Sequence, residues 1–272
     1  GVGSTSAAAV ADNDDLLIIP SGFAEGTAAA IANLAQETAV FNYAQLFKTA
    51  ASLNNTETAG KNYLGDSRNI ERMKALRKHK EGIENAYLYG ERNRITTDPA
   101  APLNLTGGLL YWITTNTLPS AGTLTDPEFE TFIASVFAHT GGSGTRTLFM
   151  SSLVTSVLDQ LAKGALRVTP KDETFGISLR QWSTSHGNLN LIKHRFLDQG
   201  AQALAGTVTG GYAGSAFALD MSKIRTRHLR QMKLETNVQA NGDDLWKDQY
   251  LSECGLEVAN NALHGYVSGV TG

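Results

Sequence analysis

Residues 66–90 read DSRNIERMKALRKHKEGIENAYLYG, and this stretch decides the fold. Asp66 and Ser67 form a good N-cap, and Glu71 lies in the early turns, where the helix dipole favours an acidic side chain. The apolar residues form a narrow stripe that Lys80 interrupts: Ile70, Met73, Leu76, Ile83 and Tyr87. The pattern predicts one long helix from about Arg68 to Asn93, a rod of roughly 35 Å.

The segments on either side of this helix predict parts that contact other chains. Residues 1–15 are small and polar and predict an extended arm. Residues 16–66 mix short apolar runs with Gly, Asn and Thr, which indicates a long loop with ribbon character, and residues 38–49 can pair as a strand. After the helix, Gly107–Ile113 is a continuous apolar run, which predicts a buried strand or a tightly packed short helix. This combination favours a self-assembling protein over an enzyme.

The composition excludes several classes of protein. The chain has 272 residues, of which 42% are hydrophobic and 18% charged, so it can bury a sizeable core. Lys and Arg number 23 against 26 Asp and Glu, and a net charge of −3 gives no general attraction for nucleic acid or an anionic membrane. No apolar run approaches the roughly 20 residues of a membrane span, and residues 1–11 lack the pattern of a signal peptide. The single cysteine, Cys254, excludes an intrachain disulfide and is expected to be a small buried residue.

The rest of the chain predicts an α+β fold with antiparallel ribbons rather than a regular strand–helix alternation. Asp126-Pro127 begins a helix, because Pro is favoured at the first helical position. Its apolar face has helical spacing: Phe129, Phe132, Ile133, Val136 and Phe137. Ser151 and Ser152 cap a second helix, whose inward residues are Leu153, Val154, Val157, Leu158 and Leu161. Strands are expected at Arg146–Met150, in a hairpin that starts at Phe175 and turns at Gly187-Asn188, at 216–219, at 231–238 and in the extended stretch 249–269, with turns at 116–125 and Gly242-Asp243.

Two motifs suggest a specific function, and each has a simpler explanation. The run Arg72–Lys80 is strongly basic and suggests a nucleic-acid-binding helix. Acidic residues lie among and after the basic ones, and no aromatic stacking platform interleaves them, which favours a solvated face or a subunit contact. Thr140–Thr145 reads TGGSGT and suggests a phosphate-binding loop, but it lacks the Gly-Lys-Ser/Thr ending and precedes a strand. A hinge or helix stop is the preferred interpretation.

No catalytic, cofactor-binding or metal-binding residue is predicted, so the chain is not expected to be an enzyme. No histidine spacing matches a zinc site, and all six are expected at the surface or in turns: His79, His139, His186, His194, His228 and His264. The Ser, Asp and His residues form no nucleophile elbow or triad signature.

Several stretches resemble, in their order and spacing, those of one known family. Asn42–Phe47, NYAQLF, followed by Thr56, looks like the end of that family's extended loop, and Leu76–Gly90 looks like its spine helix. Thr106–Asn116 resembles the Gly-Gly-apolar segment that follows. The C-terminal stretches that agree are Phe217–Asp220, Arg227–Arg230, Gly242-Asp243 and Leu263–Gly265. The family is the tailed-phage major capsid (major head) proteins of the Hong Kong 97-type fold, and the resemblance covers roughly residues 35–272.

The resemblance implies four regions. They are an N-terminal arm and extended loop at 1–66, a peripheral domain with the spine helix at 67–122, an axial domain at 123–222, and return strands to the peripheral domain at 223–272. It implies hexamers and pentamers of this chain in an icosahedral shell around double-stranded DNA, which lies nearby without sequence-specific contact and with no membrane involved. Portal, decoration or scaffolding proteins are further expected partners.

The resemblance also implies a place and a maturation step. The expected location is the virion, in the phage head, with assembly in the bacterial host cytoplasm. Removal of an upstream scaffolding segment by a head protease is consistent with a chain that begins at Gly1.

Two other functions stay open at this point. A soluble enzyme with an unrecognised site would be a monomer or small oligomer with a concave polar pocket. Another phage structural component, such as a decoration or tail protein, would form rings, tubes or trimers rather than shells.

Overall fold

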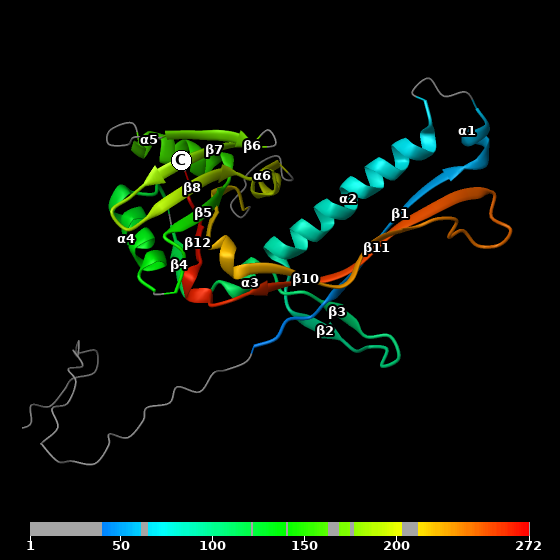
Figure 1. The fold of residues 1–272 in the computed structure, drawn as a ribbon, viewed down its shortest axis with the longest axis horizontal. Coiled ribbons are helices and arrows are strands. Elements are labelled where there is room, and N and C mark those ends of the chain that lie inside the picture. Colours follow the sequence, from blue (N-terminus) through cyan, green and yellow to red (C-terminus); the bar gives the residue numbers. More distant parts are fainter. Residues whose placement is uncertain are drawn as a thin grey trace, which may run out of the picture. The chain divides into compact units, whose positions relative to one another are not determined.

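The computed structural model describes residues 40–60, 65–120, 122–139, 141–162, 169–174, 177–202 and 212–271. The chain divides into two units, Gly1–Val40 and Phe41–Gly272, and the description below concerns the second. The arm predicted at 1–15 and the hairpin start predicted at Phe175 therefore lie outside the described residues. The described strands form a three-stranded sheet, a seven-stranded sheet and a two-stranded ribbon (Figure 1).

The three-stranded sheet, here called the long sheet, is antiparallel in the order β1-β11-β10. Its strands are β1 (Gln45–Asn54), β10 (Ile224–Glu235) and β11 (Leu245–Val258). All of β1 pairs with β11 without a register shift. A short helix, α1 (Asn55–Ala59), follows β1, so the predicted loop character is wrong for 45–59, although the predicted ribbon pairing is confirmed. Both β10 and β11 begin earlier than the sequence patterns predicted.

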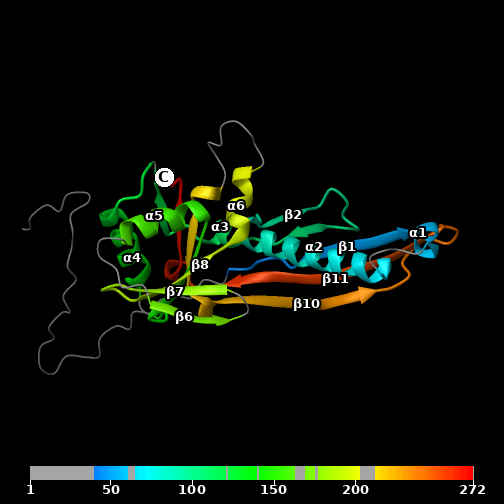
Figure 2. The same ribbon diagram turned by 90° about the horizontal axis from the view of Figure 1, so that it is seen from above.

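The long helix α2 (Ser67–Tyr89) confirms the predicted rod. The Asp66 carboxylate accepts the backbone N–H of Arg68 at 3.0 Å, and the helix ends at Gly90, before the predicted Asn93. Figure 2 shows α2 lying along the long sheet, where it contacts β1 and β11. Of the residues in the apolar stripe, Met73 is 71% exposed and the other four are half-buried. The fully buried residues of the helix are Ala75, His79 and Leu88.

The segment after α2 is a hairpin followed by a short helix. β2 (Asn93–Ile95) and β3 (Leu103–Leu105) pair antiparallel, and α3 (Leu109–Trp112) follows. Of the two structures predicted for Gly107–Ile113, the short helix is therefore correct. The connector predicted at 116–125 is wrong in part, because β4 (Asn116–Pro119) is a strand parallel to β12.

The seven-stranded sheet is mixed and has the order β4-β12-β9-β5-β8-β7-β6. Its other strands are β5 (Thr145–Met150), β6 (Thr169–Thr174), β7 (Ile177–Ser183), β8 (Asn188–Lys193), β9 (Ala216–Leu219) and β12 (Gly265–Ser268). The strands predicted at Arg146–Met150 and 216–219 are confirmed, and so is the hairpin turn between β7 and β8. The extended stretch predicted at 249–269 is divided between β11 in one sheet and β12 in the other.

Helices α4 (Asp126–Phe137) and α5 (Ser152–Ala162) bury their predicted faces against this sheet. A capping box between Thr125 and Glu128 begins α4. The remaining elements are α6 (Arg195–Gln202) and the 3-10 turns η1 (Tyr212–Gly214), η2 (Met221–Lys223) and η3 (Asn261–Leu263). Helices packed on mixed and antiparallel sheets confirm the predicted α+β class.

Candidate functional site

Asn42 anchors the point at which the N-terminal segment enters the described fold. Its Nδ2 group donates to the Thr106 hydroxyl at 3.1 Å and to the carbonyls of Gly107 at 2.9 Å and Leu256 at 2.7 Å. Its Oδ1 atom accepts the backbone N–H groups of Tyr43 at 2.9 Å and Gly107 at 2.8 Å. The Asn42 side chain therefore holds together three stretches that are far apart in the sequence.

Gln45 completes this anchor. It stands three residues after Asn42 in the NYAQLF stretch, and the two side chains contact neighbouring residues, Thr106 and Gly107. The Oε1 atom of Gln45 accepts the backbone N–H of Thr106 at 3.1 Å, and Thr106 is fully buried. A buried backbone donor left without an acceptor costs about 1–3 kcal/mol, so the pair Asn42 and Gln45 satisfies groups that water cannot reach. The two polar residues of the motif thus have structural roles.

The glycines of the Gly-Gly-apolar segment permit a close crossing of two backbones. The N–H of Gly108 donates to the carbonyl of Gly90 at 2.7 Å, immediately after α2 ends. A Cβ atom at Gly108 would lie 2.7 Å from the carbonyl oxygen of Ala86, and one at Gly90 would lie 2.4 Å from that of Thr106. Only glycine fits there, because a contact under 3 Å between a methyl group and a backbone oxygen forces the chains apart.

Arg92 gathers an aromatic cluster beside the anchor. Its guanidinium lies 4.8 Å from the ring centre of Phe41, 5.6 Å from Tyr111 and 5.8 Å from Trp112. Its Nη1 donates to the carbonyl of Phe41 at 2.8 Å. Phe41 is nevertheless 60% exposed, so the cluster leaves aromatic surface at the solvent boundary.

Polar clamps hold α2 on the long sheet. Buried His79 contacts the hydroxyls of Thr49 at 3.0 Å and Ser252 at 2.8 Å. Arg72 pairs with the fully buried Asp248 at 2.6 Å and lies over the ring of Trp246. Burial lowers the pKa of His79, which keeps the ring neutral between its two hydroxyl partners. The prediction of a surface histidine is wrong at this position.

The basic run of α2 is divided between the two faces of the helix. Arg72 faces the sheet, whereas Lys74 and Arg77 pair with acidic neighbours on α2 itself, Glu71 at 2.6 Å and Glu81 at 3.1 Å. Pairs this exposed contribute little to stability. The local pairing weakens the net positive field that nucleic-acid recognition requires and agrees with the preferred interpretation of this run.

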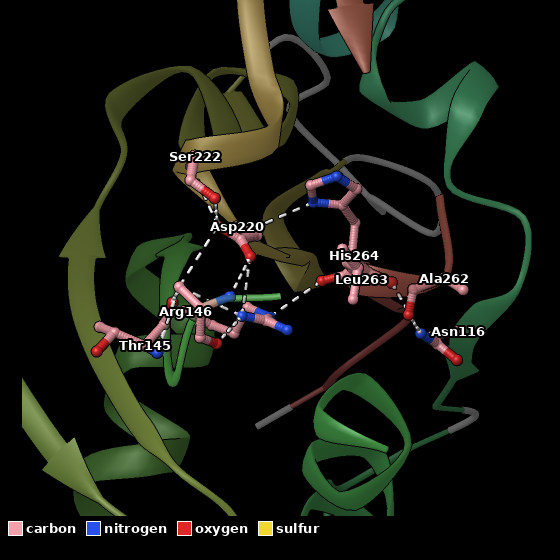
Figure 3. A network of polar contacts seen from close by, with 9 residues as sticks. Asn116, Thr145, Arg146, Asp220, Ser222, Ala262, Leu263 and His264 are labelled. Carbon is pink, nitrogen blue, oxygen red and sulfur yellow. Dashed lines mark hydrogen bonds and ion pairs between the residues drawn. The ribbon is translucent and has the colours of Figure 1, made fainter. Parts of the chain in front are cut away.

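A buried ion pair lies where the neighbouring interior strands β5 and β9 of the seven-stranded sheet meet at their ends (Figure 3). The guanidinium of Arg146 donates to the Asp220 carboxylate at 3.0 Å, and each side chain is 1% exposed. Arg146 also donates to the Leu263 carbonyl at 3.1 Å and to the Ser143 carbonyl. Burial acts to raise the pKa of Asp220, but hydrogen bonds from Ser222 and Ser143, together with the Arg146 charge, hold this pKa below its ordinary value.

The glycine-rich loop closes over this ion pair. The Ser143 N–H donates to the Asp220 carboxylate at 2.8 Å, so this donor is not directed at a phosphate. A Cβ at Gly142 would lie 2.2 Å from the Arg146 guanidinium, which explains why glycine stands there. The loop follows α4, as the helix-stop interpretation predicted, and it also packs against a charge.

His264 joins the same network from the opposite side. It is fully buried, and its Nδ1 accepts the Asp220 backbone N–H at 3.2 Å. Burial is the main cause that lowers its pKa. With Nδ1 as the acceptor, the proton of the neutral ring is on Nε2. The surface prediction is therefore wrong for His264 as well, because burial follows from tertiary packing.

The pairings in these polar centres were not predicted from the sequence. A usable signal existed for the ion pair, because Arg146 stands in an otherwise uncharged strand with no acidic residue within three positions. The family resemblance marked the stretch Asn42–Phe47, but not the contacts of Asn42, because the acceptors of its Nδ2 group lie 64 to 214 residues away.

The described ranges hold no other recognisable chemical site. No group of three or more His, Cys, Asp or Glu side chains in them is placed to hold a metal ion. None of the helices in this part of the chain is long and apolar enough to cross a membrane. Cys254 is fully buried, which confirms the prediction for that residue.

The sequence matches a known protein family over nearly its whole length. A family model described as SU10 major capsid protein matches residues 8–271. The chain belongs to this family. The SU10 major capsid protein match spans the anchor, α2 and both sheets, and it confirms the capsid family that the sequence resembles. The protein is thus a bacteriophage capsid protein and a structural protein.

A curated relative agrees with this assignment. The major capsid protein of Pseudomonas phage PaMx41 is 24% identical over 258 residues, which are 89% of this chain and 59% of the relative. The chain therefore spans less than two thirds of the length of that relative.

Solved structures show the same fold at low identity. The capsid of an empty GTA particle has a TM-score of 0.57 at 11% identity, covering 93% of this chain and 81% of that one. The SrpI encapsulin complex of Synechococcus elongatus PCC 7942 has a TM-score of 0.56 at 10% identity, covering 84% and 74%. Gordonia phage Cozz gives 0.52 at 15% identity, covering 92% and 79%. The SU10-family chain therefore has the Hong Kong 97-type fold that the resemblance predicted.

Proposed function

We propose that this chain assembles with itself, as hexamers and pentamers, into the icosahedral head shell that encloses the double-stranded DNA of a tailed phage. The observation that carries the proposal is the SU10 major capsid protein match across residues 8–271. The shared fold with the capsid of a GTA particle supports it.

The surface of the single chain suits such an assembly. Large apolar side chains are left exposed at Met73 (71%), Leu229 (70%), Phe41 (60%) and Leu103 (50%). Contacts that cover such side chains are individually modest, and symmetry repeats them in every subunit of a shell. On this proposal the chain has a structural role, with no catalytic activity and no metal or cofactor.

The proposal keeps the four regions implied by the resemblance: arm and extended loop at 1–66, peripheral domain at 67–122, axial domain at 123–222 and return strands at 223–272. The pairing of β1 with β11 supports counting Gln45–Asn54 with the peripheral domain as well. The protein would act in the virion after assembly in the host cytoplasm. Portal, decoration or scaffolding proteins would be its partners, and packaged DNA would lie nearby without sequence-specific contact.

Sedimentation velocity and negative-stain electron microscopy of the purified protein test this function. We expect capsomers and closed shells whose proportion rises with protein concentration. A compact monomer that never forms capsomers would contradict the proposal. Rings or tubes without shells would instead favour another structural component of the phage.

A further inference from the structure

One face of α2 carries an uncovered apolar groove. Its lining residues are Met73, Leu76, Arg77, Lys80, Glu81 and Glu84, and its volume is about 330 Å³. The opposite face of the helix packs on the long sheet through Ala75 and His79. Of the apolar stripe that the sequence pattern predicted, Met73 is 71% exposed and Leu76 is half-buried, and these two residues supply the apolar part of the groove.

The hairpin β2–β3 also presents apolar side chains that the chain does not cover. Ile95 and Leu103 stand directly opposite each other, and they are 40% and 50% exposed. The connection between the strands ends in the apolar sequence Pro99-Ala-Ala-Pro102. A two-stranded hairpin is marginally stable in water and gains stability by packing on another surface.

The charges of these two elements are arranged in complementary order. Along α2, basic Arg77 and Lys80 precede acidic Glu84, whereas the hairpin has Arg94 near its base and Asp98 near its tip. Arg94 and Asp98 are four residues apart and can be separated by at most about 13 Å. Arg77 and Glu84 are separated by about 10 Å of helix. These spacings allow both opposite-charge pairs at once when the hairpin tip points toward the start of α2. Arg94 would then share Glu84 with His194, which lies 2.7 Å from it, and Asp98 would share Arg77 with Glu81.

We propose that the groove on α2 receives the hairpin β2–β3 of a second copy of this chain. The tip Pro99–Pro102 covers Met73 and Leu76, Asp98 lies against Lys80 and Arg77, and Arg94 lies near Glu84. This inference rests on the proposed self-assembly, for which it names a pair of contacting surfaces. Because the two surfaces differ, each copy can donate one hairpin and receive another, and a repeated contact of this kind closes rings or extends a lattice.

Engineered disulfides test the contact directly. The variant Met73→Cys with Ala101→Cys places one thiol in the groove and one at the hairpin tip, while the native Cys254 stays buried. After mild oxidation of assembled particles, we expect a ladder of covalent dimers, trimers and larger species on non-reducing gels. The matched control, Met73→Cys with Thr131→Cys, moves the second thiol to the exposed side of α4 and should give no ladder.

Particles that assemble and yield no more crosslinked product than the control would overturn the docking contact and leave the proposed function intact. Failure of the unmodified protein to assemble would instead contradict the proposed function. The two results are distinguishable, because missing crosslinks can be observed only when particles form, whereas failure to assemble means that no particles form.

A double-mutant cycle covers the case in which the cysteine variants do not assemble. Asp98→Asn removes the charge and keeps an acceptor for the Ala100 N–H, which Asp98 binds at 2.9 Å. We expect Asp98→Asn and Lys80→Gln each to lower shell yield several-fold, and their combination to be no worse than either alone. In the control cycle, Lys78→Gln replaces Lys80→Gln, and the effects should multiply. The inference would be overturned if the losses in shell yield also multiplied when Lys80→Gln and Asp98→Asn are combined.

Discussion

The long sheet with α2 and the seven-stranded sheet with α4 and α5 are stabilised in different ways. Among the described residues, α2 packs on the long sheet through a cluster of four buried apolar residues, Ala51, Leu53, Ala75 and Trp246. Leu88 near the end of α2 joins a second cluster, which contains Leu256 of β11 and Phe217 of β9. The cluster beneath α4 and α5 contains seventeen buried apolar residues. Since burial of apolar area is the main favourable term in folding, the seven-stranded region has far more stabilisation of its own.

In the long-sheet region, strand pairing and buried polar contacts supply part of the stabilisation that the small apolar cluster does not. All of β1 pairs with β11, and Arg72 and His79 attach α2 to β11 through the buried polar partners Asp248 and Ser252. Met73 on α2 and Ile95 and Leu103 on the hairpin remain exposed. This contrast teaches that one part of the subunit is built around its own core, whereas the other leaves apolar surface for neighbouring copies.

The largest effect on folding is expected from Asp220→Ala in the well-packed region. It leaves the buried Arg146 charge unpaired, which costs about 3–5 kcal/mol of unfolding free energy. Urea unfolding of unassembled protein, followed by tryptophan fluorescence, measures the loss. As a matched control, Arg146→Met with Asp220→Leu removes both charges and should recover most of the stability. A loss below about 1 kcal/mol for Asp220→Ala would mean that water reaches the pair.

A smaller effect is expected at the anchor of the long-sheet region. Asn42→Ala leaves buried partners unsatisfied, among them the Gly107 N–H, and should cost about 1–3 kcal/mol. Amide hydrogen exchange should report faster exchange at Gly107 while the amides of β5 stay protected. The exposed Asn93 provides a control, since Asn93→Ala should change neither measurement. Equal deprotection of both regions would contradict a local anchor.

Acidification should weaken both regions through one buried histidine in each. Burial lowers the pKa of His264 and of His79 below the ordinary value of 6.5. The folded protein therefore binds fewer protons than the unfolded chain, so stability is complete above pH 6.5 and falls as the pH drops through that value. His264→Asn keeps an acceptor for the Asp220 N–H and cannot titrate. Its unfolding free energy should depend less on pH between 6.5 and 5, and an unchanged slope would exclude His264 as a source.

The smallest effect on folding is expected from reversing the exposed charges of α2. Lys74→Glu, Arg77→Glu and Lys78→Glu together should leave the unfolding midpoint of unassembled protein nearly unchanged, because exposed pairs contribute little. The same variant should impair assembly if this face contacts neighbouring subunits. Normal shells at normal yield, measured by sedimentation, would exclude a subunit-contact role for these residues.

Local patterns predicted the elements whose signals lie close together in the sequence. The cap at Asp66 and the faces of α4 and α5 follow from spacing and capping residues, and all are present, whereas α2 ends at Tyr89, a few residues before the predicted end. The buried face of α2 could not be predicted in the same way. Helical spacing shows which residues share a face, but not whether that face packs against another element or is exposed to solvent.

The sequence by itself determined the α+β class, the long helix, the amphipathic helices and, through the order of its motifs, the capsid family. Only the tertiary structure decided that Asn42 joins Thr106, Gly107 and Leu256, that Arg146 meets Asp220, and that His79 and His264 are buried. The physical reason is the distance along the sequence over which each kind of interaction acts. Helix caps and periodicity act within a few residues, whereas hydrogen-bond satisfaction and charge pairing join groups that only the folded backbone brings together.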